Sequence, residues 1–163
     1  MPAPDSGWFF PLFILMWLAI SATLSLIGGW HALAERFASM ESVEGDRYRF
    51  RTADIGWGPL PVSYGACLFL TVGPKAFSMS VLFVFRFLHP RLVIPWDAVE
   101  RCDRVKFWLM NRVAVHVKGS NRRILFPGAV GERVLGAWIE FAAQRASSNH
   151  RLYTDARKSG ARG

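Results

Sequence analysis

The feature that most constrains this chain is an uncharged apolar run near its N-terminus. The segment WFFPLFILMWLAISATLSLI, from Trp8 to Ile27, is 20 residues long and contains no charged residue. At a rise of 1.5 Å per residue, a helix of this length reaches about 30 Å, which is the hydrocarbon thickness of a bilayer. Trp8 and Trp30 flank the run and are predicted to anchor it at the two membrane interfaces. We therefore predict a short N-terminal segment over residues 1–7 and one transmembrane helix over residues 8–27.

The residues around this run favour an anchor that crosses the inner membrane once. The leading segment MPAPDSG contains no Lys or Arg, and the run is longer than the apolar part of an ordinary signal peptide. All twenty Lys and Arg residues follow it, and the first two are Arg36 and Arg47. Positive charge is enriched on the cytoplasmic side of a membrane. We predict an N-terminus outside and a cytoplasmic domain.

A short amphipathic stretch follows the anchor over residues 28–43. Trp30, Leu33, Ala34 and Phe37 recur at helical spacing and form one apolar stripe. This pattern predicts a short helix at the membrane interface, or a continuation of the membrane helix, and then a linker.

From residue 44 to residue 146 the pattern changes to that of a β domain. Alternation and turn residues predict seven strands, over residues 47–52, 67–72, 77–81, 91–95, 105–110, 113–117 and 123–126. A turn or short helix is expected over residues 96–99, and a tight connection at Asn111 and Arg112. The apolar stretch 65–96 could suggest a second membrane span, but Lys75, Arg86, His89 and Arg91 divide it into pieces too short to cross.

The C-terminal part of the chain predicts one helix and a tail. Five apolar residues between Glu132 and Gln144 share one broad helical face. From Ser147 the sequence is polar and basic and has little to bury, so residues 147–163 are expected to be a disordered tail.

The order of seven strands and one helix resembles that of the bacterial PH-like (GRAM-like) domains of small membrane-anchored proteins. The segments that carry the resemblance are LTVGPKAFSMSV, FRFLHPRLVIPWDAVERC, NRVAVHVKGSNRRILFP and ERVLGAWIEFAA, within residues 45–145. The resemblance implies a mainly β fold of two roughly orthogonal antiparallel sheets, a β-sandwich or barrel, closed at one end by a C-terminal amphipathic helix.

No pattern in the sequence indicates catalysis, a cofactor or a metal. Cys67 and Cys102 have no metal-ligand spacing, and the four histidines each have a structural interpretation. Phosphate-binding, dinucleotide-binding and hydrolase motifs are absent from the sequence. We expect no catalytic residues, no metal site and no cofactor.

Basic residues give the remaining functional signal, since the net charge of the chain is +8. Lys118, Arg122 and Arg123 lie around one predicted hairpin, with Arg112 at a nearby turn, and together they are candidate contacts for phosphate or anionic lipid. The interpretation as an ordinary solvated turn stays open. The loop at residues 56–63, where lipid-binding members of the resembled family carry basic residues, contains none.

Three functions therefore remain as expectations. The first is a non-enzymatic membrane-anchored scaffold or accessory subunit, whose domain binds a protein partner in a membrane complex. The second is a peripheral sensor of anionic lipid headgroups, and the third is an enzyme of unknown class. Nucleic acid is not expected as a partner, because the charge is spread out and no recognition motif occurs.

Overall fold

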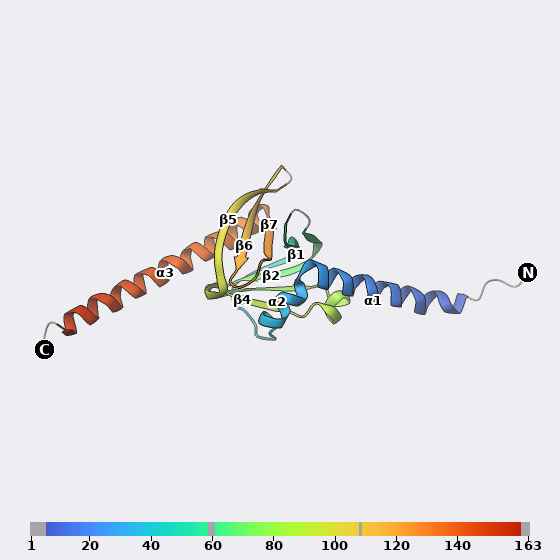
Figure 1. The fold of residues 1–163 in the computed structure, drawn as a ribbon, viewed down its shortest axis with the longest axis horizontal. Coiled ribbons are helices and arrows are strands. Elements are labelled where there is room, and N and C mark those ends of the chain that lie inside the picture. The colour runs from blue at the N-terminus through green and yellow to red at the C-terminus, as the bar shows by residue number, and fades with distance from the viewer. Residues whose placement is uncertain (1–5, 59–60, 108, 161–163) are drawn as a thin grey trace, which may run out of the picture.

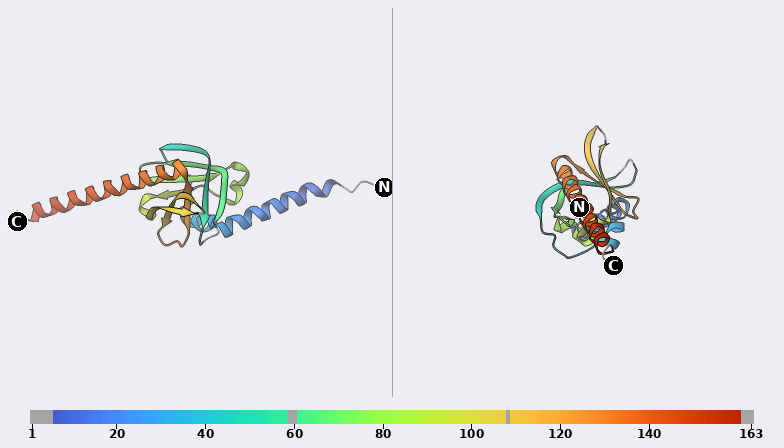
Figure 2. Two further views of the ribbon diagram at one scale, coloured as in Figure 1. Left: turned by 90° about the horizontal axis from the view of Figure 1, so that it is seen from above. Right: turned by 90° about the vertical axis from the view of Figure 1, so that its left-hand side faces the viewer.

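A computed structural model of the chain describes residues 6–58, 61–107 and 109–160. It consists of one seven-stranded antiparallel sheet, curled into a half-barrel, with a long helix leaving each end (Figure 1). The predicted class, mainly β with α, is confirmed. The two long helices point away from the domain in opposite directions (Figures 1 and 2).

Helix α1, Phe9–Gly28, follows a short 3-10 turn, η1 (Ser6–Trp8). Among the described residues it is the one helix long and apolar enough to cross a membrane, which is compatible with an anchor and equally with a signal sequence. Its first half stands clear of the domain (Figure 1), so that Trp8, Phe9 and Phe10 are about seven-tenths exposed. An apolar surface of this kind is typical of a segment that meets lipid or another protein.

The sheet has the order β4-β3-β2-β1-β7-β6-β5. The strands are β1 (Asp46–Gly56), β2 (Val62–Val72), β3 (Ala76–Val81), β4 (Leu92–Pro95), β5 (Val99–Phe107), β6 (Met110–Val117) and β7 (Arg123–Pro127). Two separate sheets were expected. The structure has one, because Asp54 and Ile55 of β1 pair with β2 on one side and with β7 on the other.

Strand β1 is longer than the alternation in the sequence indicates. Its pairing with β2 shifts register between Tyr48 and Arg51 and again between Arg51 and Ala53, and Phe50 has a φ of 53°. Such irregularities bend a strand and increase its twist. The bulge interrupts the alternation of side chains, so the period-two pattern does not predict the C-terminal part of β1. The bend allows β1 to pair with strands in both halves of the half-barrel.

One connection lies elsewhere than predicted, and two others form 3-10 helices. Phe107 pairs with Met110, so the β5–β6 turn precedes Asn111 and Arg112, and both of these residues belong to β6. Leu109, at the turn, has a φ of 67°, a conformation unusual for a residue with a side chain. The apolar segment after β3 forms a 3-10 helix, η2 (Phe83–Leu88). The short helix predicted near residue 96 is present as η3 (Trp96–Ala98).

Helix α2, Trp30–Phe37, packs against the domain. Its stripe is apolar as predicted, but Trp30 and Leu33 are almost fully buried in the core of the domain. Trp30 therefore does not reach a membrane interface, which corrects the expectation of an interfacial anchor at this residue. The helical periodicity shows that this apolar face of α2 must be shielded from water, and in this structure the core of the domain shields it.

Helix α3, Gly128–Gly160, is much longer than predicted. Val130, Val134, Leu135 and Ala137 are buried against the sheet. Residues 147–160, expected to belong to a disordered tail, continue the helix to Gly160, because no Gly or Pro lies between Gly136 and Gly160. Residues 161–163 of the predicted tail lie outside the described residues. This second half projects beyond the domain (Figure 2).

Candidate functional site

The basic residues predicted around the β6–β7 hairpin make separate contacts with backbone carbonyl groups. Lys118 Nζ donates to Asp97 O at 2.7 Å, Arg122 Nη1 to Ile27 O at 3.0 Å, and Arg123 Nη2 to Gly58 O at 2.8 Å. Their acceptors lie on η3, on α1 and in the loop after β1. The three side chains thus make three separate contacts within the protein and do not converge on one site.

Arg112 has a structural role that the sequence does not reveal. Its guanidinium forms an ion pair with Asp54 of β1, and the two side chains are 15% and 4% exposed. The guanidinium also lies 5.5 Å from the ring centre of Phe107. A buried carboxylate requires a partner of this kind. The predicted phosphate-contact role at a turn is corrected, because Arg112 is on a strand and neutralises Asp54.

The junction between α1 and the domain is closely packed. Gly29 ends α1 with a φ of 84°, a left-handed conformation that suits glycine. Arg122 donates to the carbonyl of Ile27 in the last turn of α1, where a cation also complements the helix dipole. A Cβ at Gly28 would lie 2.9 Å from Cβ of Val62. The end of α1 is therefore built into the domain.

Three aromatic rings meet directly behind this junction. Trp30, Tyr64 and His89 have ring-centre separations of 5.2, 5.4 and 5.5 Å. Trp30 Nε1 donates to Pro90 O at 3.0 Å, and the Tyr64 hydroxyl lies 3.4 Å from His89 Nε2 and from Leu24 O. The cluster ties α1, α2 and the segment before β4 together.

The electrostatics of this cluster favour neutral side chains. Burial lowers the pKa of His89, while a hydrogen bond with Phe85 O opposes the shift. Burial also raises the pKa of the Tyr64 hydroxyl and of the adjacent Cys67 thiol. A neutral imidazole, a protonated phenol and a protonated thiol provide structure rather than a nucleophile or an acid.

A small apolar cavity of about 270 Å³ lies beside these rings, between α1 and the sheet. Its wall includes Leu24 of α1, Val62 and Cys67 of β2, and Phe85 of η2. Ser21 and Ser25 of α1 face the protein and are 5% and 3% exposed. Two of the three hydroxyl side chains of α1 are thus turned toward the domain, and the third, that of Thr23, is exposed and donates to Ala19 O within the helix.

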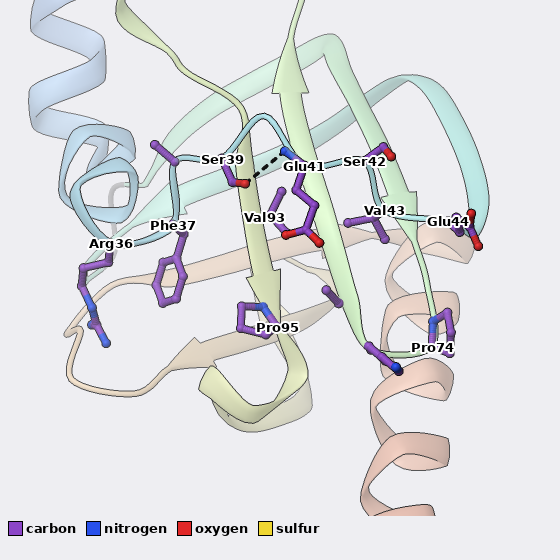
Figure 3. Close-up of a pocket in the computed structure, with 13 residues that line it drawn as sticks. Arg36, Phe37, Ser39, Glu41, Ser42, Val43, Glu44, Pro74, Val93 and Pro95 are labelled. Atoms are coloured by element: carbon purple, nitrogen blue, oxygen red, sulfur yellow. Dashed lines mark hydrogen bonds between the residues drawn. The ribbon is translucent and has the colours of Figure 1, made fainter.

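An open groove of about 660 Å³ lies beside the linker from α2 to β1. Linker residues from Ser39 to Glu44 form one wall, and Pro74, Val93 and Pro95 lie across from them (Figure 3). Its charged residues are of both signs: Arg36, Glu41, Glu44 and Lys75. A groove with an apolar floor and mixed charges suits a peptide segment better than a single anion.

A second groove, of about 390 Å³, collects four arginines, Arg47, Arg49, Arg86 and Arg91. The hydroxyl residues Thr71 and Ser80 also line it. None of these four guanidinium groups lies within ion-pair distance of a described carboxylate, whereas Arg101, Arg104, Arg112, Arg133 and Arg145 each do. We call this the arginine groove. Alternation in the sequence places Arg47 and Arg49 on one face, but only the fold brings η2 and the residue before β4, Arg91, beside them.

The described residues contain no cluster of three or more His, Cys, Asp or Glu side chains that could hold a metal ion. Comparison with models of protein families finds no match to this chain, and comparison with curated proteins finds no similar sequence.

Proposed function

We propose that this protein is a single-pass membrane protein whose β domain, PH-like in its order of seven strands and one helix, acts as a non-enzymatic scaffold or accessory subunit. In this arrangement α1 crosses the inner membrane with its N-terminus outside, and the domain binds a protein partner in the cytoplasm. The proposal draws on the apolar surface of α1 and on the positive residues that follow it.

The observation that carries the scaffold role is the second half of α3. Beyond Gln144 the helix leaves the domain, and residues 144–151 are all exposed. Arg145 still contacts Asp97 near the start of this half. A helix without packing is only marginally stable in water, and most helices in proteins are stabilised by a packed face. A partner that packs along this half would supply that support, on the side of the domain opposite α1.

The charge of the projecting half of α3 indicates which kind of partner surface would be complementary to it. Between Gln144 and Gly160 the sequence contains four Lys and Arg residues and one acidic residue. An acidic or mixed-charge partner surface is complementary to it. The open groove beside the linker offers a second contact for an extended segment of the same partner.

Site-specific photo-crosslinking in the full-length chain tests this proposal. A benzophenone side chain at Ser148, exposed on α3, should crosslink to one membrane-complex subunit, and the same group at Lys106, exposed on β5, should not. Truncation after Gln144 should abolish co-purification of that subunit in mild detergent. Identical crosslinks from both positions, or retention of the subunit by the truncated chain, would contradict the proposal.

A lipid-headgroup sensor is the second candidate, and the arginine groove is the observation that favours it. The two roles are compatible, because α3 and the arginine groove are different surfaces.

A further inference from the structure

We infer that η2 inserts into the membrane beside α1, below the headgroups, and that the arginine groove next to it binds the phosphate of an anionic phospholipid. This inference rests on the proposed membrane span of α1. It assigns a ligand class to four residues that were not among the predicted contacts, and it fixes how the domain lies on the bilayer.

The contact between α1 and η2 sets the depth. The rings of Trp17 and Phe85 have centres 5.6 Å apart, and η2 lies beside α1 in Figure 1. Trp17 precedes Ile27 by ten residues, or about 15 Å along a helix. A span of about 17 residues, the shortest length that crosses a bilayer, would run from Trp8 to Leu24. Trp17 would then lie seven residues, or about 10 Å, inside the bilayer from the end of the span. Phe85 is therefore at the level of lipid.

The composition of η2 suits that environment. Its sequence is FVFRFL, and the side chain of Phe83 is 76% exposed. An exposed aromatic ring next to a membrane-spanning helix removes apolar surface from water when it enters lipid. Arg86 is the one charged residue of η2, and a long arginine side chain can extend from an apolar depth toward the headgroups.

The arginine groove lies on the same side of the domain, since Arg86 of η2 is one of its walls. Guanidinium groups form paired hydrogen bonds with phosphate oxygens. Among the described residues, no carboxylate pairs with these four arginines. They leave a local positive charge that a zwitterionic headgroup does not neutralise, whereas an anionic lipid does. The linker acids Glu41 and Glu44 line the other groove. A phospholipid such as phosphatidylglycerol fits both the charge and the depth.

Spin-label accessibility in the full-length chain tests the depth. Single cysteines at Phe83, at Leu15 in α1 and at Ser148 in α3 are introduced after Cys67 and Cys102 are replaced by Ala, and the chain is reconstituted in bilayers. The label at residue 83 should show high oxygen accessibility and low accessibility to a water-soluble nickel complex, as the label at residue 15 does. If residue 83 behaves like residue 148 while residue 15 is in lipid, this inference is wrong and the anchor stands. If residue 15 is also aqueous, both proposals fail.

Native mass spectrometry of the full-length chain in neutral detergent tests the ligand. Titration with phosphatidylglycerol should give tighter binding than titration with phosphatidylcholine. Each basic residue near an anionic surface contributes about a fivefold effect, so Arg86→Gln/Arg91→Gln should weaken phosphatidylglycerol binding about 30-fold. The matched control, Lys75→Gln/Lys106→Gln, removes the same charge from exposed sites elsewhere and should change binding less than twofold.

Two results would overturn the assignment: equal affinity of the wild-type chain for the two lipids, or equal weakening by the two double variants. The thermal midpoint of each variant is measured first. If Arg86→Gln/Arg91→Gln does not fold, the single change Arg86→Gln, at an exposed side chain, replaces it, with an expected fivefold loss.

Discussion

Replacement of Trp96 by Ala tests how the half-barrel is held together. Trp96 follows β4, and its side chain is 1% exposed. Its ring centre lies 5.1 Å from that of Phe77, and its Nε1 donates to Gly73 O at 2.9 Å. The change removes a large buried ring and leaves a buried carbonyl without its donor. Truncation of a buried aromatic to Ala costs about 3–5 kcal/mol, a large part of the 5–15 kcal/mol that typically stabilises a protein.

A second variant separates the two parts of this effect. Trp96→Phe keeps an aromatic ring and loses the N–H, so it should cost about 1–3 kcal/mol, the penalty for an unsatisfied buried acceptor. Trp57 is 62% exposed, and Trp57→Ala should stay within about 0.5 kcal/mol of the wild type.

The assay is denaturant unfolding of the full-length chain in neutral detergent, followed by circular dichroism. The full-length chain is needed because Trp30 and Leu33 of α2 belong to the core. A loss below about 1 kcal/mol for Trp96→Ala, with an unchanged denaturant slope, would refute the packing argument.

Four further predictions concern the anchor, its direction and two buried groups. The full-length chain should stay in the membrane pellet after high-salt and carbonate washes, and its release would rule out the membrane span. A reporter fused after Gly163 should be active only in its cytoplasmic form, and active alkaline phosphatase there would reverse the topology. Arg112→Gln leaves Asp54 buried without a partner and should cost about 3–5 kcal/mol; an unchanged midpoint would show that the pair is solvated. Burial lowers the pKa of His89 below its ordinary value of 6.5, so the stability that this group contributes is present above pH 6.5 and is lost as the pH falls toward the folded pKa. Acid-induced loss of stability should shrink in His89→Gln, with a remainder from His116, whose pKa burial also lowers; an identical pH profile would exclude His89.

Local patterns in the sequence predict much of the fold. The apolar run forms α1 within one residue of its expected bounds, and the alternation over residues 77–81 appears as β3. The turn or short helix expected over residues 96–99 is present as η3. These features depend on neighbouring residues alone, and periodicity and length are sufficient for them.

The rest depends on partners distant in sequence. The apolar stripe that begins at Trp30 predicts a helix at the membrane interface, but Trp30 packs near Pro90, sixty residues later. Arg112 looked like a solvated turn residue because its partner, Asp54, lies on another strand behind a bulge. In the same way the arginine groove brings together residues of β1, of η2 and of the segment before β4. A sequence shows which side chains need a partner, but the topology decides which one they meet.

The burial of Trp30 has a consequence for how the protein is made. The ribosome releases α1 and α2 well before the residues around Pro90, whose carbonyl accepts the Trp30 N–H. In the proposed arrangement α1 has entered the bilayer by then, while the indole of Trp30 still lacks its surroundings. The core is therefore completed only after membrane insertion, at the surface of the bilayer. A proteolytic fragment that begins at residue 44 would lack Trp30 and Leu33, and it would have a gap in its interior. The folding of the domain therefore depends on residues of α2 that directly follow the anchor, and not only on the covalent connection to it.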